Sequence, residues 1–83
     1  PNPERSAASA SLGIERPARD RVTVHDAAGR AVRVLLDGDV PAGVHRVGWD
    51  LRSVAARRVP AGIYFLRLQA GEVRLARKVA VVR

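Results

Sequence analysis

Apolar and polar residues alternate in short runs along most of this chain, and a two-residue period is typical of β-strands with one buried face. In the first run, Ala10, Leu12 and Ile14 share one side. In a later run, His45, Val47 and Trp49 share a face, which we expect to point inward. The runs that predict strands cover residues 9–16, 21–25, 31–36, 44–49, 62–68 and 73–82.

Gly, Pro and Asp separate these runs, as expected for turns. Asp26 to Arg30 predicts a hairpin in which Gly29 takes a positive φ, and Gln69 to Glu72 predicts another. Turns or interruptions are also expected at Pro17–Asp20, Asp37–Asp39 and 40–43. Because residues 51–58 lack apolar periodicity, they are interpreted as a connecting loop or a short edge strand.

The spacing of strands and turns predicts an all-β fold, an antiparallel β-sandwich of about seven short strands. No segment has a convincing helical stripe. Residues 1–8, with two prolines close together, predict an extended lead-in or linker, and residues 9–83 a single sandwich domain.

The run after Pro60-Ala61-Gly62 is apolar except at Arg67, which is expected for a strand in the middle of a packed sheet. The stretch Val40–Trp49 repeats its turn-then-strand pattern, so we expect the two to lie close together. Trp, Tyr and Phe offer the largest areas to bury. The predicted structural core is Trp49, Tyr64, Phe65, Leu66 and Leu68.

Composition adds a strong basic bias to this picture. The chain of 83 residues has a net charge of +7 and no cysteine, and Lys78 is the single basic residue that is not Arg. Stability must therefore come from packing and strand pairing without disulfides. The arginine excess has three interpretations: a composition bias of the source, a thermophilic surface, or an anionic partner such as nucleic acid or cell-surface polysaccharide.

Candidate chemistry is sparse. Asp37 and Asp39 could offer oxygens to calcium, but no third carboxylate is near and a turn explains them better. His25 and His45 lack the spacing of a zinc motif, and no serine lies beside a histidine. The sequence therefore predicts a protein that is not an enzyme and needs no cofactor. Nucleic acid is an unlikely partner, since all three aromatic residues are assigned to the core.

No apolar run approaches the roughly 20 residues of a membrane helix, so no membrane span is expected. The first residues lack the apolar region of a signal peptide, and there is no initiator Met. We therefore expect this domain to belong to a larger parent protein that continues upstream of Pro1.

Six short motifs follow one another along the chain: Asn2-Pro3, Val24-His25-Asp26 with Gly29-Arg30, Gly43-Val44-His45 with Val47, Trp49-Asp50, Gly62–Leu68 and Arg77-Lys78-Val79. Taken together in this order, they resemble a known bacterial family. The chain is similar to the C-terminal sorting domain of the type IX secretion system and to the related immunoglobulin-like domain of the flagellar hook-capping protein. The residue after Trp49-Asp50 is usually Gly in this family, whereas this chain has Leu51.

The resemblance implies an immunoglobulin-like sandwich in a secreted or cell-surface protein that first crosses the periplasm. It implies that the outer-membrane secretion machinery recognises the end of the domain. The alternative is a structural module that joins neighbouring copies of a surface assembly through exposed edge strands. The candidate recognition residues are Gly62, Tyr64, Lys78, Val79, Val81, Val82 and Arg83.

Tyr64 has a second expected role. In immunoglobulin-like folds, a tyrosine near the start of a late strand often bonds its hydroxyl to the backbone at a corner of the sandwich. We therefore predict a tyrosine corner at Tyr64.

Overall fold

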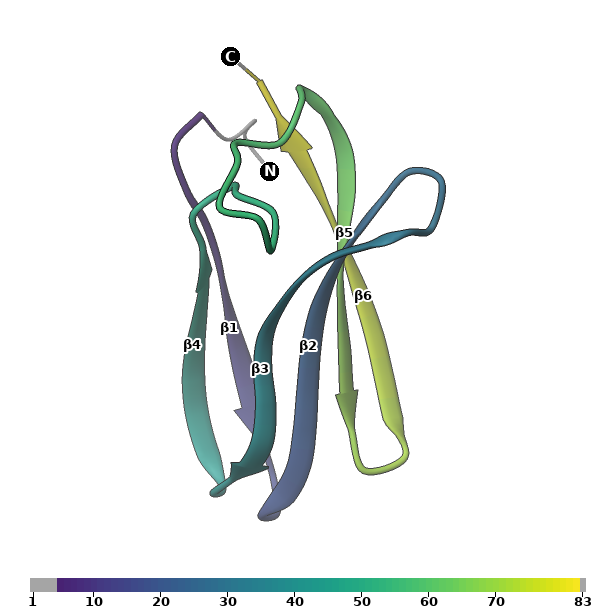
Figure 1. The fold of residues 1–83 in the computed structure, drawn as a ribbon. Helices are drawn as coiled ribbons and strands as arrows, with labels where there is room; N and C mark the ends of the chain where they lie inside the picture. Colours follow the sequence, from purple (N-terminus) through teal and green to yellow (C-terminus); the bar gives the residue numbers. More distant parts are fainter. Residues whose placement is uncertain (1–4, 83) are drawn as a thin grey trace.

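The fold is an antiparallel β-sandwich, as predicted, with six strands in the part of the chain that the structure describes (Figure 1). The computed structural model describes residues 5–82, so the expectations for Asn2-Pro3 and Arg83 lie outside the described residues. The strands are β1 (Ala8–Ile14), β2 (Ala18–Asp26), β3 (Ala31–Val40), β4 (Gly43–Trp49), β5 (Gly62–Ala70) and β6 (Val73–Val81).

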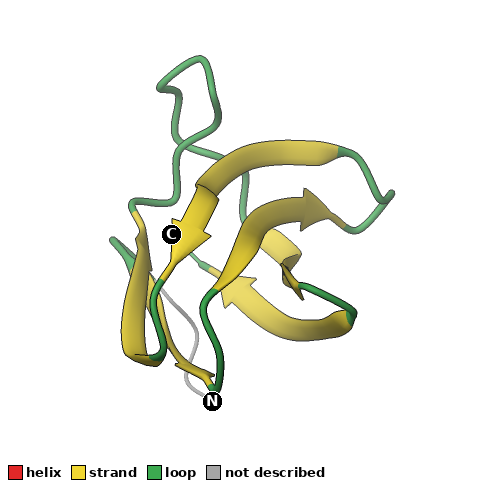
Figure 2. Cartoon of the chain, turned by 90° about the horizontal axis from the view of Figure 1, so that it is seen from below, coloured by secondary structure: helices red, strands yellow, loops and turns green. Residues whose placement is uncertain are grey.

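The strands form two sheets of unequal width. The smaller sheet pairs β1 with β4, and the larger sheet has the order β3-β2-β5-β6. Seen along the strands, the two sheets curve around a shared interior (Figure 2). β5 lies between β2 and β6, which confirms the prediction that residues 62–68 form a central strand.

The core fills the space between the sheets. Trp49 of β4 meets Tyr64 of β5 edge to face, with ring centroids 5.4 Å apart and an interplanar angle of 64°. The stretches around these two residues therefore lie close together, as expected. Leu66 and Leu68 continue the buried side of β5, and the loop residue Leu51 closes the interior.

Phe65 is a correction to the predicted core. It is half-buried and is not part of the core cluster that contains Trp49, Tyr64, Leu66 and Leu68. Successive side chains of a strand point to opposite faces, so Phe65 lies on the outer face when its neighbours Tyr64 and Leu66 point inward.

Two predicted breaks are also wrong, because β2 begins at Ala18 and β3 runs on to Val40. The predicted interruption at Pro17–Asp20 and the predicted turn at Asp37–Asp39 lie largely within these strands. The physical reason is cross-strand charge pairing: Arg19 pairs in register with Asp39 and donates to Asp37 at 3.0 Å. The chain reverses instead at residues 41–42.

The segment expected as a loop or a short edge strand is a loop. Its only bridge joins Arg52 to Arg58 within residues 51–58, so the fold has one strand fewer than the seven or so expected.

The first half of β6 is exposed. Val73 and Leu75 retain 54% and 60% of their accessible surface, although alternation places them on the same side of the strand as the buried Val81. β6 is an edge strand of the larger sheet, and the two-stranded sheet is too narrow to cover it. Only the end of this strand therefore has a buried face.

Candidate functional site

The predicted recognition residues that the structure describes meet at one end of the β5–β6 hairpin, close to the C-terminal end of the described chain (Figure 1). Gly62 pairs with Val81, and Tyr64 pairs with Val79. A hairpin brings the start of its first strand beside the end of its second, which is why residues so far apart in sequence lie together.

The side chains of these residues divide between the core and the surface. Tyr64 and Val81 are buried, and Val79 packs against the core. Lys78 is exposed on the opposite face, and Val82 is half-buried. A partner can therefore reach Lys78, Val82 and the free backbone edge of β6, whereas the other three side chains stabilise the fold.

The predicted tyrosine corner is confirmed. The Tyr64 hydroxyl donates to the carbonyl oxygen of Pro60 at 2.6 Å, four residues upstream. The contact ties the loop before β5 to the strand, and it leaves the Tyr64 ring against Trp49.

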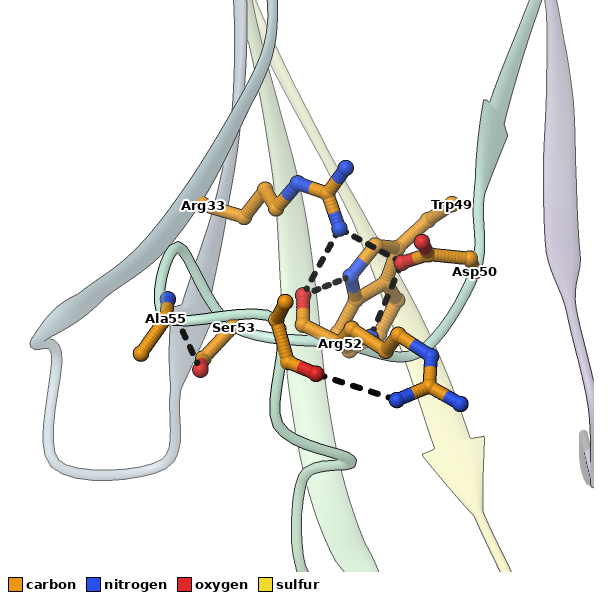
Figure 3. Close-up of polar contacts among 7 residues, drawn as sticks. Arg33, Trp49, Asp50, Arg52, Ser53 and Ala55 are labelled. Atoms are coloured by element: carbon orange, nitrogen blue, oxygen red, sulfur yellow. Dashed lines mark hydrogen bonds and ion pairs between the residues drawn. The ribbon is translucent and has the colours of Figure 1, made fainter.

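A polar network holds the loop that follows β4 (Figure 3). The Asp50 carboxylate accepts from the Arg33 guanidinium at 2.6 Å and from the Arg52 amide at 3.0 Å. The Arg52 carbonyl accepts from Arg33 at 3.2 Å and from the Trp49 indole at 2.9 Å. The charged groups of this cluster bond to one another and to the backbone, so the network fastens the loop over the core.

Both histidines make local polar contacts within the fold. His25 contacts the Thr23 hydroxyl and the Gly29 carbonyl, and His45 contacts the Pro41 carbonyl at 2.7 Å. Within residues 5–82, no group of three or more His, Cys, Asp or Glu side chains could hold a metal ion. That part of the chain also contains no helix of the length and hydropathy needed to cross a membrane.

The β2–β3 hairpin holds Asp26 in a network of hydrogen bonds. Asp26 accepts from the amides of Ala28 and Arg30 and from the Arg30 guanidinium, each at about 3 Å. The Arg30 amide, more than any other group, lowers the pKa of Asp26 below its ordinary value, and the Arg30 side chain adds to the effect.

Asp20 belongs to the predicted interruption at Pro17–Asp20, but in the structure it lies within β2 and is fully buried. No described residue donates a hydrogen bond to either oxygen of its carboxylate. The sequence carries a signal for this burial: Asp20 stands two and four residues before Val22 and Val24, and residues at that spacing share one face of a strand.

The chain is similar to known proteins at the level of its family and of its fold. A family model described as FlgD Ig-like domain matches residues 2–73. No curated protein matches the sequence.

Two solved structures from Porphyromonas gingivalis share the fold. One is dimeric latent PorU, with a TM-score of 0.76 and 23% identity over 99% of this chain. The other is PorZ, described as an essential bacterial surface component of the type-IX secretion system, with a TM-score of 0.70 and 21% identity over 100% of this chain. This chain spans 9% of the PorU chain and 11% of the PorZ chain.

Proposed function

Because this chain belongs to the FlgD Ig-like domain family, we propose that it is a non-catalytic module of a secreted or cell-surface bacterial protein and acts as a sorting and surface-attachment signal for type IX secretion. The observation that carries the proposal is that PorZ, a component of that system, contains a domain that aligns with the whole of this chain.

In this proposal the domain crosses the periplasm, and the outer-membrane secretion machinery recognises the end of the β5–β6 hairpin. Lys78 and Val82 offer accessible side chains, and the free edge of β6 offers unpaired backbone groups. The buried Tyr64 and Val81 hold these groups in place.

A reporter fusion tests the sorting role. Residues 1–83 are joined to the C-terminus of a periplasm-directed reporter in a host that has the machinery, and surface exposure of the reporter is measured. We expect surface display, and we expect Lys78→Glu to reduce it severalfold. Arg46→Glu is the matched control, because Arg46 is exposed on β4 and its substitution changes the net charge by the same amount as Lys78→Glu. A reporter that stays in the periplasm with the unaltered domain would refute the proposal.

An assembly role is the second candidate, and the exposed apolar side chains of β6 favour it. Val73 and Leu75 lie on an edge strand, which is a ready template for pairing with the same edge of a neighbouring copy. Sedimentation of the purified protein at high concentration should then show oligomers that Leu75→Lys disrupts. Val54→Lys is the control, since Val54 is also an exposed apolar residue, at 87% against 60% for Leu75, but lies in a loop. A monomer at every concentration would exclude this candidate.

A further inference from the structure

The outer face of the larger sheet carries an ordered grid of side chains. Directly paired residues of neighbouring strands share a face, so the register of β2, β5 and β6 defines three rows on the side away from the core. We call these positions the outer grid; its rows are Arg21, Gln69 and Arg74; then Thr23, Arg67 and Ala76; then His25, Phe65 and Lys78.

Four cations of the outer grid are exposed: Arg21, Arg67, Arg74 and Lys78. Over the described part of the chain, none of the four forms an ion pair, because the three salt bridges there use Arg19, Arg30 and Arg33. The nearest acid by register is Asp37, opposite Arg21 on β3, and Arg19 already engages it.

Arg67 lies one row away from Arg21 and Arg74 on the neighbouring strands, and like charges at this diagonal spacing of about 7–8 Å repel one another. An anionic ligand on the outer grid would relieve this repulsion. Sheet geometry places adjacent rows about 7 Å apart and alternate strands about 10 Å apart, so the cations could meet several acidic groups along one extended polymer.

The uncharged members of the outer grid indicate the kind of polymer. Gln69 can exchange hydrogen bonds with hydroxyl groups, and the half-buried ring of Phe65 offers an apolar surface to one sugar ring. A shallow hollow in this face is lined by Arg21, Arg67, Gln69 and Arg74. Single-stranded nucleic acid would need aromatic rings for successive bases, whereas the outer grid has one phenylalanine.

We propose that the outer grid binds an acidic polysaccharide, with Arg21, Arg67 and Arg74 pairing with its carboxylate or phosphate groups and Phe65 packing against a sugar ring. Arginine suits this role because its planar guanidinium can bond an acidic group through two donors at once. Of the three interpretations of the arginine excess, this proposal adopts the anionic partner, and it gives the half-buried Phe65 a contact with the ligand.

The proposal can be tested with purified chain and polygalacturonate, a polymer of carboxylated sugars, by isothermal titration at low salt. We expect binding that weakens as salt is raised, no binding of neutral dextran, and at least tenfold weaker binding by the triple variant Arg21→Ser, Arg67→Ser, Arg74→Ser. The control is Arg16→Ser, Arg46→Ser, Arg57→Ser, which removes the same charge from exposed positions outside the outer grid. Phe65→Ser should weaken binding severalfold without changing its salt dependence, and thermal unfolding verifies that each variant folds.

Equal losses in the two triple variants would overturn the proposal, because net charge alone would then account for binding. Tighter binding of a single-stranded oligonucleotide, or of anionic lipid vesicles, than of polygalacturonate would also overturn it. Lys78 is left unchanged in every variant, and binding in solution is measured apart from export in cells. Failure here is therefore distinguishable from failure of the sorting role.

Discussion

At the scale of single residues, the tyrosine corner is one hydrogen bond whose contribution to stability can be measured directly. Tyr64→Phe removes the hydroxyl that donates to Pro60 and keeps the ring against Trp49. We expect a loss of about 1 kcal/mol in the free energy of unfolding, the usual net value of one hydrogen bond. Urea unfolding followed by the fluorescence of the single Trp49 measures it, and an unchanged midpoint would contradict a stabilising corner.

Leu51 combines backbone strain with full burial. Its φ of 61° lies in the left-handed region that favours glycine, and its side chain is 0% exposed. A left-handed residue costs roughly 1–2 kcal/mol, whereas deleting a buried leucine side chain costs about 2–5 kcal/mol. The lost packing exceeds the relieved strain, so Leu51→Gly should destabilise the fold by about 1–3 kcal/mol.

Ala56 is the matched control for Leu51, because it has a φ of 60° but is exposed. Ala56→Gly should leave stability unchanged or raise it by up to about 1 kcal/mol, since it relieves strain without exposing a core side chain. A stabilising Leu51→Gly would mean that strain outweighs packing at this loop.

At the scale of elements, the β2–β3 hairpin should respond to pH through Asp26. Its folded-state pKa is lowered, so its contribution to stability is present above the unfolded pKa of about 3.9 and is lost as pH falls through the lower folded value. Asp26→Asn removes the charge that Arg30 stabilises. We expect the variant to have a lower melting temperature than the wild type at pH 7, and we expect the difference between the two melting temperatures to shrink below pH 4. A difference that does not change with pH would show that the carboxylate charge is irrelevant.

β2 also carries the unpartnered Asp20. A buried polar group without a partner costs about 1–3 kcal/mol, and a valine would extend the apolar side that Val22 and Val24 form. Asp20→Val should therefore raise the free energy of unfolding by at least about 1 kcal/mol. Asp39→Val, at an exposed position of the neighbouring strand, is the control. Loss of stability on Asp20→Val would mean that its carboxylate has a favourable role in the fold.

The strands differ in how well their sequences predict them. Alternation predicted β1 and β4, because each has one clearly apolar side, and a nearly continuous apolar run predicted β5. It failed at Asp20 and at Asp37 to Asp39, where polar residues resemble turns but lie inside paired strands. The sequence of one strand does not show which charges lie opposite it on the neighbouring strand. Cross-strand charge pairing therefore kept these polar residues in strands although their sequence favours turns.

At the scale of the whole molecule, turn spacing was sufficient to predict a sandwich, and the hairpin turn at Gln69–Glu72 was sufficient to bring Gly62 near Val81. The outer grid could not be predicted in the same way. It depends on the register of three strands and on which face of β5 is buried, and both faces of that strand are largely apolar in sequence. Assigning Phe65 to the core hid the one aromatic residue of that face.

Charge is the property that acts on the whole chain at once. With a net charge of +7, mutual repulsion opposes the compact state, and dissolved salt screens it. We expect the melting temperature to rise by about 2–4 °C between 10 and 300 mM sodium chloride, as a gain of about 0.5 kcal/mol would produce in a domain of this size. The variant Arg16→Glu, Arg46→Glu, Arg57→Glu lowers the net charge by six, to +1, and should lose most of this dependence. A melting temperature that falls with salt would show that the three ion pairs outweigh the repulsion, and the unpaired cations of the outer grid would then not need an anionic ligand to be tolerated.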